Sequence, residues 1–290
     1  MQELFATIVS MICAKIVCEN LQNIFNPNGR VKGRKKMKHD VVYLLKNNYG
    51  STEELKYSIR SVVQNFPYRK IVFVGGEPEG LKPDLMIPDE QTGETKWARS
   101  THSLKTAIKS NELTEDIWLF NDDFFVMDRV REFEASNYFG GTLEKRCRDL
   151  RARVGGSSYT GYMEQMRGKL IELGKDTLSF SLHVPFLINR IKAQALFEEF
   201  PNLKMFRSFY GNYYEIDCKY MRDVKIHDLM SVDIESPFLS TTDESFKRGK
   251  VGEFLRKYFA EPSRYELDRG NNLREQTKEI YDEEGNERYG

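Results

Sequence analysis

The sequence predicts an α/β protein with a mixed, mainly parallel sheet flanked by helices. Apolar runs at residues 41–46 and 70–74 are separated by a helical pattern that ends near residue 66. A strand–helix–strand order of this size is typical of a right-handed βαβ unit. A third apolar run, residues 117–120, follows a second helical pattern at residues 96–109. Short apolar runs of this kind are typical of strands buried in a parallel sheet.

Cap and turn residues bound these elements. Ser51 is placed as the N-cap of the first helix with Glu54 as its capping-box partner, and Phe66-Pro67 ends that helix. A short strand is also expected at residues 85–87. Open α/β sheets bind ligands beyond the carboxyl ends of their strands, so residues 40–130 are expected to form a nucleotide-binding half. The loops expected at this edge are Asn47-Asn48, Gly75-Gly76 and residues 121–123.

Three side chains that carry oxygen atoms, Asn121, Asp122 and Asp123, interrupt an apolar stretch that resumes at residues 124–127. Buried carboxylates need a partner or a metal ion. Oxygen ligands at the end of a strand suit Mg²⁺ or Mn²⁺, with substrate phosphates completing the coordination shell. Because Asn and Asp are also common turn residues, a simple turn is the alternative interpretation.

The chain changes character after residue 130. Residues 145–153 are strongly basic, and residues 155–161 are rich in glycine and serine. This pattern fits either a mobile loop that closes over a substrate or a solvated helix followed by a linker. Further elements are expected as helices at residues 162–173, 185–200 and 243–259, and as an alternating strand at residues 177–182.

Two residues of this half are candidates for chemistry. Pro185 would open the predicted helix, which puts His183 just ahead of a helix N-terminus that favours an anion. A lone histidine more often has a structural role. Arg207 lies among aromatic residues and needs a partner. That partner is either a phosphate bound bidentately or a carboxylate such as Asp217.

Composition narrows the class of protein. Among 290 residues, 44 Lys and Arg balance 44 Asp and Glu, so no overall field favours nucleic acid. The four cysteines show no metal-binding spacing, which favours reduced thiols in a cytoplasmic protein and argues against zinc.

The two ends of the chain are expected to lie outside a single domain at residues 40–266. Residues 5–18 are apolar but shorter than the ~20 residues that a membrane span needs. A basic run follows, so residues 1–38 fit either peripheral contact with an anionic membrane surface or a dispensable helix and linker. Residues 267–290 are polar and are expected to form a flexible tail.

Four separated motifs together resemble the Stealth family of hexose-1-phosphate transferases. The first is Asp40-Val41-Val42-Tyr43 with Asn47, and the second joins residues 54–61 to Phe120-Asn121-Asp122-Asp123. The third is His183-x-Pro185 followed by Phe206-Arg207. The fourth is Phe238-Leu239-Ser240 with Asp243, then Phe254-Leu255 and Pro262-Ser263-x-Tyr265-Glu266. Leu45, Asn48 and Thr242 depart from the family's pattern, so donor and acceptor identity do not transfer.

The resemblance implies a glycosyltransferase-A-like fold, with residues 131–266 as a catalytic and acceptor half that includes a helical insertion. It also implies transfer of a sugar-1-phosphate from a nucleotide-diphosphate sugar to a hydroxyl of a polysaccharide or other cell-envelope glycan. Mg²⁺ or Mn²⁺ would be held by Asp122 and Asp123, and the ion and Arg207 would neutralise the charge of the diphosphate. His183 would be the base, so that His183, Arg207 and Asp123 are the expected catalytic residues. Substrate or nucleotide contacts would come from Asn47, Arg60, Asn121, His102 and Asp243.

Two other functions fit the same residues. A metal-dependent glycosyltransferase would use the same acids but would release a nucleoside diphosphate instead of a monophosphate. A glycan-binding protein that kept the fold would need no catalytic acids.

Overall fold

The computed structural model describes residues 38–47, 50, 52–130, 136–232, 234 and 236–267. Most of the predicted N-terminal segment, and the tail beyond residue 267, lie outside this described part. The expectation of membrane contact through residues 1–38 concerns residues that are almost all outside it. In the described part, no helix is both long and apolar enough to cross a membrane.

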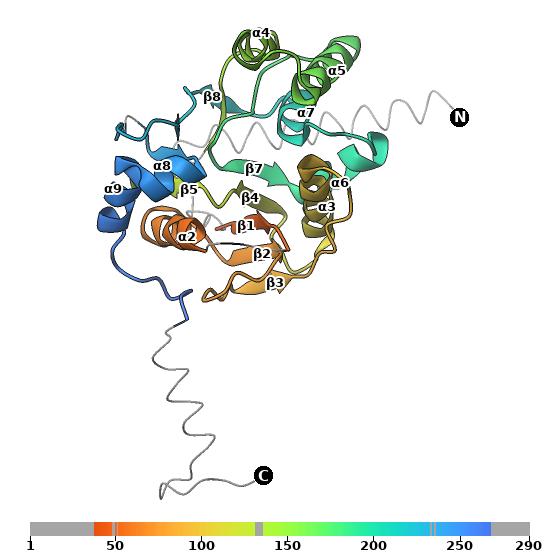
Figure 1. The fold of residues 1–290 in the computed structure, drawn as a ribbon. Coiled ribbons are helices and arrows are strands. Elements are labelled where there is room, and N and C mark those ends of the chain that lie inside the picture. Colours follow the sequence, from red (N-terminus) through yellow and green to blue (C-terminus); the bar gives the residue numbers. More distant parts are fainter. Residues whose placement is uncertain are drawn as a thin grey trace, which may run out of the picture. The chain divides into compact units, whose positions relative to one another are not determined.

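A five-stranded sheet forms the centre of the described part (Figure 1). Its order is β3 (Leu85–Ile87), β2 (Ile71–Gly75), β1 (Asp40–Leu45), β4 (Asp116–Phe120) and β7 (Phe186–Asn189). Strands β3, β2, β1 and β4 pair in parallel, and β7 pairs antiparallel with β4. The predicted mixed, mainly parallel α/β sheet is therefore confirmed.

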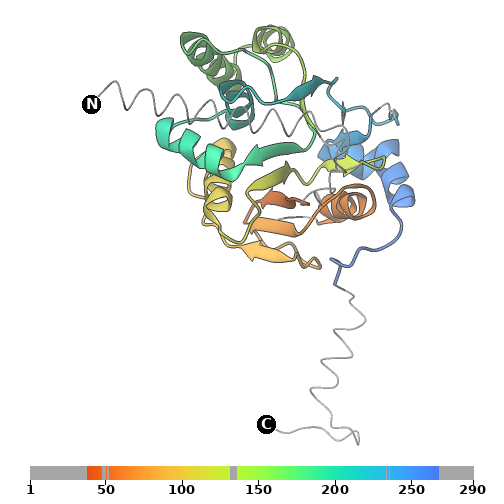
Figure 2. The same cartoon turned by 180° about the vertical axis from the view of Figure 1, so that it is seen from behind.

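Helices cover both faces of this sheet, as Figures 1 and 2 show from opposite sides. Helix α2 (Glu53–Asn65) packs on the face that carries Val41 and Tyr43. Helices α3 (Lys96–Lys109) and α6 (Arg190–Glu199) pack on the face that carries Val42. The two faces differ because successive residues of a strand point to opposite sides of the sheet.

The strand order defines where a ligand site is expected. Strand β1 has β2 on one side and β4 on the other, and both pairs are parallel. Strands β2 and β3 are thus added on one side of β1, and β4 is added on the other side. The space between β1 and β4 is therefore the topological switch point, where open α/β sheets bind ligands. Asn47 follows β1, and Asn121 with the two aspartates follows β4.

The second half of the chain adds smaller units around the central sheet. Strands β5 (Phe124–Val126), β10 (Phe238–Thr241) and β9 (Lys225–Ile226) form a sheet in that order, packed against α8 (Asp243–Arg248) and α9 (Lys250–Tyr258). Strands β6 (Asn137–Phe139) and β8 (Cys218–Tyr220) form a parallel pair. Helices α4 (Leu143–Val154), α5 (Ser158–Glu172) and α7 (Phe206–Tyr213) complete this half.

Three predicted elements of this half are wrong. The helix expected at residues 185–200 begins only at Arg190, because residues 186–189 form strand β7 along β4. Residues 177–182 make only an isolated bridge from Leu178 to Thr142. The helix expected at residues 243–259 is two helices, because the chain is extended at Gly249, where a Cβ atom would lie 2.5 Å from a backbone oxygen of Ser245.

The predicted boundaries of the other helices hold to different degrees. Helix α3 and strand β3 have the expected bounds, and α2 ends before Phe66 as expected. The capping box expected for Ser51 and Glu54 falls partly outside the described residues. The N-cap of α2 is Thr52, and the Glu54 carboxylate bonds to a residue of β10 instead.

Candidate active site

The acidic motif lies at the carboxyl end of β4, in a turn that leads directly into β5. The backbone N–H of Phe124 donates to the Asn121 carbonyl at 3.2 Å and closes this turn. The motif is therefore a turn, as the alternative interpretation expected, and it lies at the strand end where α/β sheets bind ligands.

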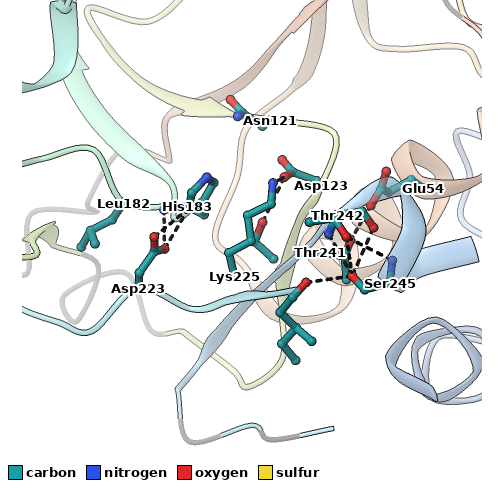
Figure 3. A network of polar contacts seen from close by, with 12 residues as sticks. Glu54, Asn121, Asp123, Leu182, His183, Asp223, Lys225, Thr241, Thr242 and Ser245 are labelled. Carbon is teal, nitrogen blue, oxygen red and sulfur yellow. Dashed lines mark hydrogen bonds and ion pairs between the residues drawn. The ribbon is translucent and has the colours of Figure 1, made fainter. Parts of the chain in front are cut away.

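Asp123 accepts two bonds on one of its carboxylate oxygens. The Lys225 ammonium lies 2.7 Å from Oδ2 (Figure 3). The Ser240 hydroxyl also donates to Oδ2, at 3.0 Å. The other oxygen, Oδ1, is buried and has no hydrogen-bond partner in the described part of the chain. A buried carboxylate oxygen without a partner is costly, so this atom is suited to a cation or donor that arrives with a ligand.

Glu54 stands beside these aspartates although the sequence assigned it only a capping role. Its carboxyl is bonded by the Thr241 hydroxyl (Figure 3). Burial raises the pKa of Glu54 to about 8, and the nearby charges of Asp122, Asp123 and Asp243 add to this effect. The Glu54 carboxyl therefore keeps its proton at neutral pH, mainly because it is buried.

His183 is held by an acid that the sequence analysis missed. Its ring Nδ1 lies 2.9 and 3.0 Å from the two carboxylate oxygens of Asp223, and its backbone N–H donates to Oδ1 at 3.2 Å. Burial alone would raise the pKa of Asp223, but the hydrogen bonds from His183 lower it below its usual range. The ionised carboxylate can only accept, so Nδ1 carries the proton and Nε2 is left as the basic nitrogen.

The predicted setting of His183 is nevertheless wrong. A strand, β7, follows it, so the helix start expected at Pro185 does not exist. Asp223 therefore supplies the local electrostatic partner instead of a helix dipole.

Asp223 and Lys225 belong to one extended segment that leads into β9. Residues two apart in an extended chain point to the same side, so one segment can hold both His183 and Asp123. Sequence distance hides this arrangement, since Lys225 is 102 residues from its partner.

Arg207 lies against the acidic turn. Its guanidinium donates to the carbonyls of Leu182 and Val184 at 3.3 and 3.1 Å, and to Asn121 Oδ1 at 3.5 Å. These contacts replace the alternative ion pair with Asp217. Burial lowers the pKa of Arg207 to about 10, partly offset by Asp123, so the group remains a cation at neutral pH.

A pocket of about 390 Å³ brings Asn121, His183 and Arg207 together, while Glu54, Asp123 and Lys225 are not among its lining residues. Six of its lining residues are Asn121, His183, Arg207, Trp97, Tyr159 and Lys204. A larger hollow of about 1100 Å³ lies beside Lys38 and Arg69, which precede β1 and β2. That hollow is therefore at the opposite edge of the parallel sheet from the acidic turn.

The other expected contact residues have different settings. Asn47 follows β1 and bonds to Gln91 and to the Asp89 carbonyl. His102 bonds to the Asp89 carboxylate through Nδ1 at 2.7 Å and lines a neighbouring pocket. Asp243 is in the first turn of α8, with its side chain 88% exposed.

Arg60 is not available as a nucleotide contact. Its Nε and Nη2 atoms donate to the Glu266 carboxylate at 2.7 and 2.6 Å, and Nη1 donates to the carbonyls of Phe259 and Ala260. These bonds occupy the guanidinium and tie α2 to the end of the described chain. The expectation that Arg60 binds substrate is therefore replaced by a structural role.

Comparison with known proteins gives structural similarity only. No family model matches the sequence, and no curated protein matches it. A structure of the galactosyltransferase LgtC with donor and acceptor sugar analogues matches 81% of this chain and 99% of its own, at 10% identity and a TM-score of 0.43. An active-site mutant of LgtC matches 62% of this chain and 72% of its own, at 12% identity and a TM-score of 0.34.

The glycosyltransferase GlyE of Streptococcus pneumoniae TIGR4 matches 84% of this chain and 64% of its own, at 13% identity and a TM-score of 0.37. Similarity at this level places no constraint on the reaction of the present chain. We therefore infer function from the residues of the site.

Proposed function

We propose that the protein transfers a sugar-1-phosphate from a nucleotide-diphosphate sugar to a hydroxyl group of a glycan. The observation that carries this proposal is the His183–Asp223 pair, at a pocket that also contains Arg207 and Asn121. A base fixed by a carboxylate and a half-buried cation on the same pocket are the groups that phosphoryl transfer needs. The motif resemblance to the Stealth family supports the same reaction.

In this reaction the acceptor oxygen attacks the phosphorus that carries the sugar. A new oxygen–phosphorus bond forms, and the bond to the oxygen that bridges the two phosphates breaks. The nucleoside monophosphate leaves with the bonding electron pair. His183 Nε2 takes the proton of the attacking hydroxyl, while Asp223 stabilises the resulting imidazolium. Arg207 lies where it can pair with phosphate oxygens.

The acidic turn fits a divalent cation. Asp123 has a buried oxygen without a partner in the described chain, and the carboxyl groups of Asp122 and Glu54 are nearby. In the described part, no group of three or more His, Cys, Asp or Glu residues could hold a metal ion, so further ligands would have to come from the substrate. Asp122 and Asp123 would hold Mg²⁺ or Mn²⁺ together with the donor phosphates, and the ion would neutralise the charge of the diphosphate.

The remaining expected contacts keep their proposed roles. Asn47 and Asn121 follow the two strands at the switch point and would contact the nucleotide or the metal shell. His102 and Asp243 would contact substrate. The acceptor class, a polysaccharide or other cell-envelope glycan, and the cytoplasmic location rest on the family resemblance and on the cysteine pattern.

The experiment that tests the reaction is product analysis with a panel of nucleotide sugars and glycan acceptors. The proposal expects a nucleoside monophosphate and a phosphodiester-linked sugar in equal amounts. Release of a nucleoside diphosphate would instead identify an ordinary glycosyltransferase that uses the same fold. Glycan binding without any nucleotide product would identify a binding protein.

A further inference from the structure

Lys225 is paired with Asp123, one of the two proposed metal ligands. Its ammonium lies 2.7 Å from Asp123 Oδ2, and the two side chains are only 18% and 13% exposed. Glu54 and Asp122 add further carboxyl groups at the same edge of the sheet. In this setting a lysine ammonium neutralises part of the acid excess.

The pairing gives hydrogen-bond partners to only one of the two Asp123 carboxylate oxygens. Lys225 and Ser240 both bond to Oδ2, whereas Oδ1 is buried and has no partner in the described residues. A structural ion pair usually satisfies the remaining buried oxygen as well, because each unpaired buried polar atom costs free energy. The arrangement is therefore suited to a site that gains a further positive group when it is occupied.

The backbone of Lys225 is fixed while its side chain can move. Strand β9 pairs with β10 in parallel, with Lys225 opposite Ser240. The ammonium is carried on a flexible four-carbon stem, so it can leave Asp123 without a change in the strand. Asp223, two residues earlier, keeps the same segment attached to His183.

We propose that Lys225 is a resident counter-ion that competes with the divalent cation for Asp123 and pairs with the donor phosphates once displaced. This inference rests on the proposed metal site and names the residue that regulates it. Two cations on one carboxylate repel each other, so an ion at Oδ1 weakens the hold of Oδ2 on the ammonium and releases it. The released ammonium then lies beside a site that is occupied by a diphosphate, which carries the opposite charge.

Calorimetric titration of the full chain with MnCl₂ tests the competition. Lys225→Met removes the ammonium and is expected to tighten Mn²⁺ binding by about tenfold, the usual scale of coupling between neighbouring sites. Lys225→Arg keeps the charge and should bind Mn²⁺ like the unaltered protein. Lys145→Met removes a lysine from its exposed pair with Asp149 and controls for the change in net charge.

A second titration, with a nucleoside diphosphate in saturating Mn²⁺, tests where the ammonium goes. Lys225→Met is expected to weaken this binding by about tenfold while it strengthens binding of the metal. A purely structural role for Lys225 would weaken both. If Lys225→Met is too unstable to purify, Lys225→Gln carries the same expectations.

Three outcomes overturn the inference: equal or weaker Mn²⁺ binding by Lys225→Met, unchanged diphosphate binding, or no Mn²⁺ binding by any variant. If no variant binds Mn²⁺ but the unaltered protein still transfers sugar phosphate, the proposed reaction holds and only its metal ion is contradicted. Conversely, tighter Mn²⁺ binding by Lys225→Met, with no transfer to any acceptor by the unaltered protein, supports the competition and contradicts the reaction. The two failures are thus distinguishable.

Discussion

His183 Nδ1 lies 2.9 Å from Asp223 Oδ1, although the two residues are 40 positions apart. This pair determines which ring nitrogen is basic. It also attaches the turn before β7 to the segment before β9, so the orientation of the candidate base depends on two distant parts of the chain.

Asp223→Asn should lower kcat by ~10²-fold or more, within the range typical of general-base catalysis, while donor binding survives. The asparagine amide can donate to Nδ1 and stabilise the wrong tautomer. Steady-state kinetics should show the loss in kcat rather than in KM. In a His183→Ala background the same change should cost little more, since the two residues act as a unit. Additive losses would contradict the pairing.

Arg207→Lys should reduce kcat/KM by ~10²-fold, because an ammonium cannot reproduce the planar set of donors that a guanidinium offers to phosphate. Equilibrium unfolding of the same variant gives the control. Near-normal kinetics with reduced stability would assign Arg207 a structural role through the carbonyls of Leu182 and Val184.

Asp122→Ala, like treatment with a chelator, should abolish transfer and the metal-dependent binding of nucleotide. Excess Mn²⁺ should restore transfer and nucleotide binding to the chelator-treated protein but not to the variant, because Asp122 contributes one of the two proposed ligands. Calorimetry with nucleotide in the presence and absence of Mn²⁺ measures both effects. Normal binding of nucleotide without metal would contradict the metal site.

Glu54 should make the protein less stable as the pH rises from about 5 to 8. Its folded pKa is raised to about 8, so the folded protein holds a proton that the unfolded chain has released in this range. Its contribution is complete below the unfolded pKa and is lost as the pH rises through the folded one. The slope is at most about 1.4 kcal/mol per pH unit, the value for one proton that only the folded protein holds.

Urea unfolding of Glu54→Gln between pH 5 and 9 measures this effect. The neutral amide cannot titrate, so the variant should have a flatter dependence of stability on pH than the unaltered protein. An identical dependence in both proteins would show that Glu54 has an ordinary pKa.

Arg60→Met should lower the free energy of unfolding by about 3–5 kcal/mol, because it leaves the Glu266 carboxylate without its partner in a largely buried pair. Glu266→Gln should show a similar loss. Donor KM, measured at a temperature where the variant is folded, should not change. An increase in KM of tenfold or more without loss of stability would restore Arg60 as a substrate contact.

The sequence alone determined the elements whose signals are local. The apolar runs and helical periods predicted β1, β2, β3, β4, α2 and α3, and the interruption at residues 121–123 located the acidic turn. It also pointed to His183 and Arg207, which the structure brings to one pocket with Asn121.

Only the tertiary structure decided which residues partner these side chains. Residues 186–189 are a strand because they pair with the edge of β4, a contact that local helical propensity does not report. The partners of His183, Asp123 and Glu54 are Asp223, Lys225 and Thr241, which are between 40 and 187 residues away. Polar contacts over such distances leave no periodic signal in a sequence, because they depend on how separate elements pack.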